Sequence, residues 1–194
     1  EGWLMSDGYL AYRDFAHRLR CWAHLLRKAR GLQESLSGSA RAFGRATRAL
    51  MDEAMKAVYA AREGPAVDLR ATFQERLEAF RALCEQHYDS SHEKTRALAR
   101  EFLNDWEAIW TVLAHPHLPL TNNEAERLLR HWVILRRISH GTRTAQGSRA
   151  LALLASVIET CRKRKVLPWP YLAQVIAERR KGHPVPPLPA AKVA

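Results

Sequence analysis

The sequence reads Thr121-Asn122-Asn123-Glu124-Ala125-Glu126-Arg127 at the point where a proline-rich loop ends and a helix is predicted to begin. The loop cannot be helical, because each proline excludes the residue before it from helical geometry. Either Asn can supply an N-cap oxygen, and the two Glu residues fall where negative charge suits the start of a helix. We therefore predict a helix that continues to about Ile138.

Glu126 fits two interpretations that the local sequence does not separate. In the first, it complements the helix dipole and pairs with Arg130 four residues later. In the second, it faces the edge of a sheet as a metal ligand, while Asn122 and Arg127 steady a phosphate or the carboxylate. Asp7, directly after a short apolar segment, would then be a second ligand, because clustered carboxylates hold divalent metals for phosphoryl transfer. A third carboxylate is missing from this set.

Composition limits the classes of protein to which the chain can belong. Its 194 residues, 47% of them hydrophobic, suffice for one domain with a core or for a core with an appendage. It has no run of 18 apolar residues, so we expect no membrane span. The three widely spaced cysteines, Cys21, Cys84 and Cys161, argue against a disulfide framework and predict a cytoplasmic location. The net charge of +11 favours an anionic partner, with nucleic acid as the leading candidate.

The pattern of apolar residues predicts two short strands followed by helices. We expect strands at residues 1–6 and 19–23, with helical spacing between them over 9–19 and a basic helix over 25–32 that Gly31 closes. From about residue 35 to 115, apolar residues repeat every three or four positions, which is typical of a helical hairpin or small bundle. Its expected helices, and those that follow the proline-rich loop, are 39–62, 67–88, 93–113, 148–164 and 171–180.

This pattern predicts five segments. The first, over 1–34, contains a strand, Asp7 and a helix, and the second, over 35–117, is a helical segment. The third, over 118–165, contains the Glu126 helix and the next helix, and the fourth, over 166–183, is a C-terminal helix. The fifth, over 184–194, is a Pro- and Ala-rich disordered tail.

Basic residues gather around the Glu126 helix and the polar loop after it. They form either an ordinary solvated face or a surface that contacts DNA phosphates, and their nearness to Glu126 favours DNA. The arginines concerned are Arg127, Arg130, Arg136, Arg137, Arg143 and Arg149.

Cys21-x-x-His24 has the spacing of half a zinc site. A structural zinc site needs four ligands, and no second Cys/His pair stands at a suitable distance in the sequence. We therefore do not expect Cys21 and His24 to form a zinc site.

Several blocks together resemble the insertion-sequence 66 family of bacterial DDE transposases. The resemblance keeps the order of the blocks and covers nearly the whole chain, most weakly in the helical middle. The blocks are Asp7-Gly8-Tyr9-x-x-Tyr12, Cys21-Trp22-Ala23-His24-x-x-Arg27-Lys28, Leu118-Pro119-x-x-Asn122-Asn123-x-x-Glu126-Arg127, Ile158-Glu159-Thr160 and Tyr171-Leu172.

The resemblance implies an α/β fold, mostly helical in this chain: part of a ribonuclease H-like core, interrupted by a large helical insertion and followed by C-terminal helices. It implies that Asp7 and Glu126 are catalytic carboxylates that bind two Mg²⁺ (or Mn²⁺) ions with a further Asp. That Asp belongs to a strand upstream of Glu1, so the chain is expected to be the C-terminal part of a longer enzyme and inactive alone.

The implied reaction is metal-dependent cleavage and strand transfer of double-stranded DNA, at transposon ends and target, by a homo-oligomer. Supporting residues would be Asn122, Asn123, Arg127, Cys21 and His24. The sequence departs from the family pattern at His131, where a Pro often stands, and in the loop 139–147. The rival hypothesis is a catalytically inactive DNA-binding or oligomerising remnant that modulates a full-length transposase.

Overall fold

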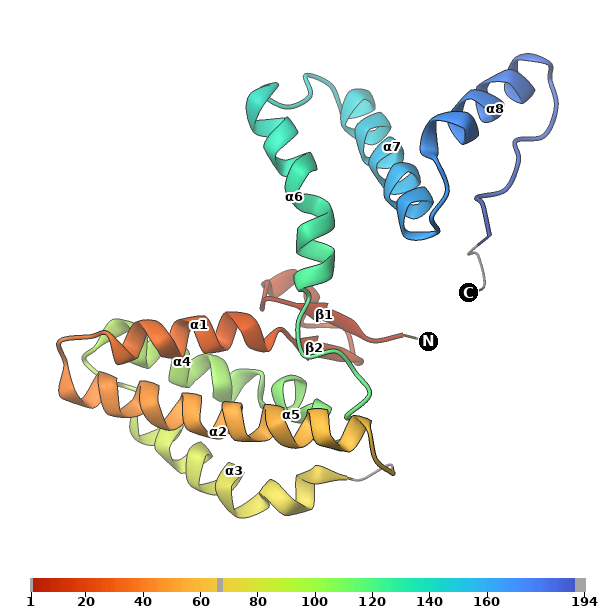
Figure 1. The fold of residues 1–194 in the computed structure, drawn as a ribbon. Helices are drawn as coiled ribbons and strands as arrows, with labels where there is room; N and C mark the ends of the chain where they lie inside the picture. Colours follow the sequence, from red (N-terminus) through yellow and green to blue (C-terminus); the bar gives the residue numbers. More distant parts are fainter. Residues whose placement is uncertain (1, 66–67, 191–194) are drawn as a thin grey trace. The chain divides into compact units, whose positions relative to one another are not determined.

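The computed structural model describes residues 2–65 and 68–190 and divides the chain into two units, the first ending at Asn123 and the second starting at Glu124 (Figure 1). The first unit contains β1 (Leu4–Ser6), the 3-10 turn η1 (Leu10–Tyr12), β2 (Arg18–Arg20), α1 (Trp22–Gln33), α2 (Gly38–Arg62), α3 (Leu69–Gln86), α4 (Glu93–Asn104) and α5 (Trp106–Ala114). The second contains α6 (Asn123–Ile138), α7 (Ala145–Lys163) and α8 (Pro168–Arg180). The first residue of α6, Asn123, is the last residue of the first unit.

The described chain is mostly helical and has one small sheet. Its two strands, β1 and β2, run parallel, with Met5 opposite Leu19 and Ser6 opposite Arg20. The prediction of a mostly helical chain with short strands near the N-terminus is therefore confirmed. These two strands are the only ones in the described residues.

The segment between the strands differs from the sequence prediction. We expected helical structure over 9–19 and a strand over 19–23, but the structure has the short turn η1, then β2, and Trp22 already begins α1. Leu10 and Phe15 are more than half exposed. Apolar spacing alone does not hold a helix together when no surface covers its apolar face, because tertiary packing supplies most helical stability.

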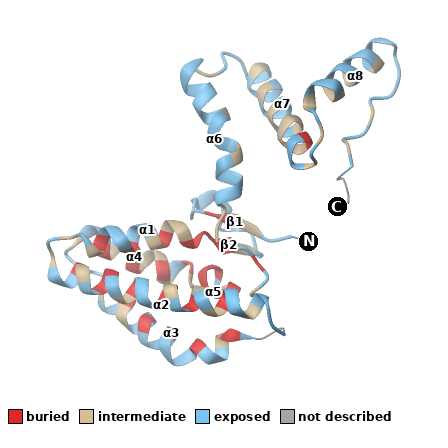
Figure 2. Cartoon of the chain, viewed as in Figure 1, coloured by how far each residue is buried: buried red, intermediate tan, exposed pale blue. Residues whose placement is uncertain are grey.

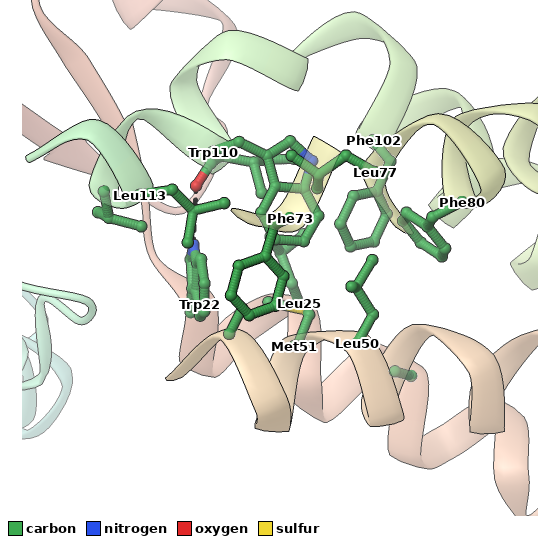
Figure 3. Packing of buried hydrophobic residues seen from close by; sticks show 14 of the residues in the cluster. Trp22, Leu25, Leu50, Met51, Phe73, Leu77, Phe80, Phe102, Trp110 and Leu113 are labelled. Carbon is green, nitrogen blue, oxygen red and sulfur yellow. Dashed lines mark hydrogen bonds between the residues drawn. The ribbon is translucent and has the colours of Figure 1, made fainter. Parts of the chain in front are cut away.

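The core of the first unit lies between its helices. Figure 3 shows Trp22 of α1 and Met51 of α2 facing Phe73 of α3 and Trp110 of α5. The indole rings of Trp22 and Trp110 meet edge to face at 5.6 Å, and the Trp22 Nε1 donates to the Ile109 carbonyl at 2.9 Å. Because its N–H group has an acceptor, the indole of Trp22 can be fully buried in the core.

A close approach of backbones joins α1 to α2. Gly44 of α2 faces α1, and a Cβ at this position would lie 2.7 Å from the Ala29 carbonyl oxygen and 2.8 Å from the Leu32 Cβ. The two helices run side by side in Figure 1. Gly31, expected to close the basic helix, lies inside α1 instead.

The helix predicted over 93–113 is two helices, α4 and α5, which meet at Asp105. Asp105 has φ −116° and ψ 24°, outside helical geometry. Its buried carboxylate forms ion pairs with Arg18 and Arg20 of β2. Because the buried Arg20 and the partly buried Arg18 hold this side chain, the break in the helix satisfies a tertiary contact that the local sequence does not reveal. The helix predicted over 67–88 is α3, and its predicted first residue, Val67, lies outside the described residues.

The second unit buries much less of its apolar surface. No residue of α6 is buried, and Leu129, Val133 and Ile138 are each more than half exposed (Figure 2). A groove of about 770 Å³ runs between α6 and α7, where the Trp132 Nε1 donates to Glu159 Oε1 at 3.0 Å. Among the described helices of the chain, none combines the length and apolar character needed to cross a membrane.

The segment after α8 has no regular secondary structure up to residue 190. The Tyr171 hydroxyl donates to the Pro186 carbonyl at 3.2 Å, and Arg164 donates to the Pro189 carbonyl. The last four residues of the predicted disordered tail lie outside the described residues.

Candidate active-site residues

Asp7 lies in the turn that follows β1, and its side chain is exposed. Its Oδ1 accepts from the backbone N–H of Tyr9 at 3.3 Å, and Gly8 adopts a φ of +105°. Next to this turn, the Cys21 N–H donates to the Ser6 carbonyl at 2.9 Å and so continues the hydrogen bonding between the strands. The Asp7 carboxylate is thus presented to solvent from a turn with a defined backbone.

Arg20, at the end of β2, lies behind this turn. Its side chain is 2% exposed, and its Nη2 donates to the Asp7 carbonyl oxygen at 2.9 Å. The same guanidinium forms ion pairs with Glu101 of α4 and with Asp105, whose side chain is 1% exposed. One buried cation therefore joins the Asp7 turn to the α4–α5 junction.

Two further cations complete this cluster. Arg18 Nη2 lies 2.8 Å from Asp105 Oδ1, and Lys28 Nζ of α1 lies 2.6 Å from Glu101 Oε2. Buried charges are tolerated only when they are paired and hydrogen-bonded, and here each carboxylate contacts two cations. Sequence analysis missed this cluster. The available signal was Arg18-Leu19-Arg20, because residues i and i+2 of a strand share a face.

Cys21 and His24 lie at the start of α1. Cys21 is fully buried, with a free thiol, and the His24 N–H donates to its carbonyl at 3.3 Å. The Trp22 N–H donates to the Leu120 carbonyl at 2.9 Å. The structure therefore brings together the sequence blocks that begin at Cys21 and Leu118, which lie almost one hundred residues apart.

The loop before α6 is fastened to the helices of the first unit. Arg62, the last residue of α2, donates from Nε to the Pro116 carbonyl at 2.7 Å and from Nη2 to the Leu118 carbonyl at 2.6 Å. Asn122 is partly buried, and its Oδ1 has no hydrogen-bond partner among the described residues. Asn123 is exposed and is the first residue of α6.

Glu124 and Glu126 both lie in the first turn of α6, as predicted, and both are exposed. Glu124 Oε1 lies 3.0 Å from Lys163 Nζ of α7. A hydrogen bond from Lys163, then its positive charge and that of Arg127, hold the pKa of Glu124 below its usual range. Glu124 is therefore engaged inside the second unit. Asp7 belongs to the first unit and Glu126 to the second.

The carboxylates of the described residues do not by themselves complete a magnesium site. Carboxylate oxygens are the ligands that Mg²⁺ prefers. The described residues, however, contain no group of three or more His, Cys, Asp or Glu side chains placed to hold a metal ion. Asp7 and Glu126 thus have suitable chemistry but fall short in number.

The candidate DNA-contacting arginines are all exposed. Arg127, Arg130, Arg136 and Arg137 lie on α6, Arg143 lies in the following loop, and Arg149 lies on α7. The charge is distributed very unevenly along the chain. Residues 124–194 contain fourteen Lys and Arg against four Glu and no Asp, and therefore carry +10 of the net +11.

Comparison with known proteins supports the resemblance seen in the sequence. Residues 1–150 match the transposase IS66 family. The uncharacterized protein y4jO of Sinorhizobium fredii is 27% identical over 98% of this chain and 57% of its own length. The uncharacterized protein y4qI of the same organism is 28% identical over 95% of the chain and 37% of its own length. The chain thus spans little more than half of the first relative and about a third of the second.

No solved structure matches this chain. The bounds of the family match extend from before β1 to the start of α7 and include the residues on both sides of the helical segment. Because it covers well over half of the sequence, the chain belongs to the IS66 transposase family.

Proposed function

We propose that this chain is the C-terminal part of the catalytic region of a DDE transposase, which cleaves DNA at transposon ends and transfers the strands to a target. The observation that carries the proposal is the family match over residues 1–150, a span that includes both Asp7 and Glu126. The exposed position of Asp7 in a turn after a parallel strand supports it, because sheet folds gather catalytic groups at the carboxyl ends of their strands.

In this proposal, β1 and β2 are two strands of a larger ribonuclease H-like sheet, and the helices α2–α5 form the insertion before the catalytic Glu. Asp7 and Glu126 would be two carboxylate ligands of Mg²⁺ or Mn²⁺, and an Asp upstream of Glu1 would be the third. Asn122, Asn123 and Arg127 would support the site from the start of α6, and Cys21 and His24 from the start of α1.

The proposed partner is double-stranded DNA, bound mainly by the second unit. Its net charge of +10 is the supporting observation, because phosphate neutralisation by Lys and Arg supplies most non-specific affinity for DNA. The exposed arginines Arg130, Arg136, Arg137, Arg143 and Arg149 are the proposed contacts. We further propose that the active form is a homo-oligomer on DNA.

One experiment tests the catalytic proposal. The full-length transposase encoded by the reading frame that contains these residues, and the 194-residue chain alone, are each incubated with a transposon-end duplex and Mg²⁺ or Mn²⁺. We expect cleavage by the full-length protein, no cleavage by the chain alone, and none by full-length Asp7→Asn. Cleavage by the isolated chain that Asp7→Asn abolishes would show that the third carboxylate is not needed from upstream.

A second candidate is an inactive DNA-binding or oligomerising remnant that modulates a complete transposase. The observation that favours it is the basic second unit, because a net charge of +10 can bind DNA phosphates without a catalytic site. The two candidates differ in the upstream coding sequence. An in-frame strand that carries an Asp favours the enzyme, and a frame without one favours the remnant.

A further inference from the structure

We propose that Arg20 is a positioning residue for Asp7, and that Arg20 with Asp105 and Glu101 makes the helical segment α4–α5 responsible for the geometry of the catalytic turn. This inference rests on the proposed function of Asp7. It concerns a cluster of charged residues, Arg20, Glu101 and Asp105, that are not among the candidate site residues identified from the sequence.

The guanidinium of Arg20 contacts three acceptors from two parts of the chain. They are the Asp7 carbonyl at 2.9 Å, the Glu101 carboxylate and the Asp105 carboxylate. The rigid planar fork of a guanidinium can satisfy several acceptors at fixed angles, whereas a lysine has one nitrogen on a flexible stem. The identity of residue 20 as Arg is therefore required by the contact geometry as well as by charge.

Gly8 shows how closely Arg20 approaches the turn. A Cβ on Gly8 would lie 2.5 Å from Arg20 Cζ and 2.7 Å from its Nη1, distances that atoms do not adopt. Together with its φ of +105°, this explains why glycine follows Asp7 in the sequence. The backbone that follows the Asp7 Cα, its carbonyl group and Gly8, is thus set by the position of one buried side chain.

The other end of the cluster is anchored in the helices. Glu101 is on α4, and Asp105 separates α4 from α5. The side chain of Asp105 is 1% exposed and that of Glu101 is 17% exposed. A shift of the α4–α5 junction would therefore have to move Arg20 or break the buried pair of Arg20 with Asp105, at considerable cost. The helical segment is therefore coupled to the orientation of Asp7.

The arrangement also suggests a variant that keeps the fold. In Arg20→Lys, Asp105 retains Arg18 as a counter-ion and Glu101 retains Lys28, so neither carboxylate is left without a cation. What Lys cannot provide is the simultaneous contact with both acids and with the Asp7 carbonyl.

The test compares Arg20→Lys with Arg76→Lys in the full-length transposase. Arg76 pairs with Glu53 on an exposed surface of the first unit and provides the matched control. For Arg20→Lys we expect a loss of about 10- to 100-fold in the rate of transposon-end cleavage at saturating DNA, with DNA affinity within about twofold, as when a group that orients a catalytic ligand is removed. Hydrogen exchange at the amides of Gly8 and Tyr9 should become faster. Arg76→Lys should change none of these.

Three results would overturn the inference. The first is wild-type cleavage by folded Arg20→Lys, the second is unchanged exchange in the turn, and the third is a parallel loss of cleavage and DNA binding, which indicates less folded protein. If Arg20→Lys does not fold, Glu101→Gln replaces it, with the same expected direction in both measurements. If Asp7→Asn cleaves like the wild type, the proposed function fails, whereas the exchange measurement still reports on the contact between Arg20 and the turn.

Discussion

The guanidinium of Arg20 fills the space that a side chain at Gly8 would need. A Cβ there would lie 2.5 Å from Arg20 Cζ, and the residue has a φ of +105°. The turn after β1 is therefore constrained in two independent ways, by backbone conformation and by a buried cation. The acid beside it, Asp7, has an exposed side chain and a main-chain carbonyl that accepts a hydrogen bond from Arg20.

Gly8→Ala should lower the free energy of unfolding by about 1–3 kcal/mol, the usual cost of a non-glycine residue held in a rarely populated backbone region. The close contact with Arg20 adds to this strain. Urea unfolding followed by tryptophan fluorescence measures the change. Gly2→Ala is the control, because nothing lies within 4 Å of a Cβ at that position, and it should alter stability by less than about 0.5 kcal/mol. Equal effects of the two substitutions would contradict this account.

Replacing two glycines near the contact between α1 and α2 by Ala should change the stability of the chain in opposite directions. Gly44→Ala places a methyl group 2.7 Å from the Ala29 carbonyl oxygen and should destabilise the chain by about 1–3 kcal/mol. Gly31→Ala changes an exposed position inside α1 with open space around it, and should stabilise the chain by about 0.5–1 kcal/mol. Thermal unfolding of the two variants decides the matter, and stabilisation by Gly44→Ala would show that the helices are farther apart than described.

The parts of the fold that depend on local chemistry could be predicted from the sequence. The helix after the proline-rich loop runs from Asn123 to Ile138, close to its predicted bounds, because prolines, Asn and early Glu residues are signals within a single turn. The break at Asp105 could not be predicted, because its cause is an ion pair with Arg20, 85 residues away.

The candidate site divides in the same way. Asp7 could be singled out because it follows a short apolar strand, and the structure places it in the turn after β1. Arg20 was missed although Arg18-Leu19-Arg20 places two arginines on one face of a strand, because a charged residue in a predicted strand is normally assigned to solvent. Only the fold shows that the Arg20 side chain is buried. The role of Glu126 rests on the family resemblance and stays a prediction.

Cys84 gives a prediction about alkaline pH. Burial, and to a smaller extent the charge of Glu85, raises the pKa of the Cys84 thiol from 9.0 to about 12. Between pH 9 and pH 12 the unfolded chain has released the Cys84 proton, whereas the folded chain has kept it. The contribution of Cys84 to the free energy of unfolding is therefore complete below pH 9 and is lost as the pH rises toward 12. The expected slope is about 1.4 kcal/mol per pH unit for one such group.

The measurement is the free energy of unfolding from pH 8 to 11 for the wild type and for Cys84→Ala. The cavity left by the substitution should lower this free energy by the same amount at every pH. The slope attributable to Cys84 should disappear in the variant. In addition, Cys84 should react with iodoacetamide only in the unfolded protein. The thiolate is the nucleophile, and burial keeps this thiol protonated in the folded protein. Rapid alkylation of native protein at pH 8 would contradict the burial of this thiol.

The uneven charge predicts where DNA binds and how salt affects it. If the second unit makes six or more phosphate contacts, affinity should fall on the order of a thousandfold between 50 and 200 mM salt. Replacing both Arg136 and Arg137 by Ala should reduce the slope of log affinity against log salt by about 2. Fluorescence anisotropy with a duplex of arbitrary sequence provides the measurement.

The control for this experiment is Arg48→Ala with Arg81→Ala, two exposed arginines of the first unit on α2 and α3. This pair removes the same charge from the protein but should leave the slope unchanged. If both double variants reduce the slope equally, DNA contact is not localised to the second unit. A flat salt dependence for the wild type would exclude phosphate-dominated binding altogether.

Glu126 and Glu124 lie two positions apart at the start of α6, about 200° around the helix axis, so only one of them can face a given catalytic centre. Glu124 already contacts Lys163 at 3.0 Å, and this exposed pair contributes little to stability. In the full-length transposase, Glu126→Gln should therefore abolish transposon-end cleavage and leave DNA binding intact, whereas Glu124→Gln should retain both. Gel analysis of cleaved ends, with Asp7→Asn as the inactive reference, separates the two. Loss of cleavage in Glu124→Gln, with full activity in Glu126→Gln, would reverse the assignment and place the catalytic carboxylate on the face of α6 that meets Lys163.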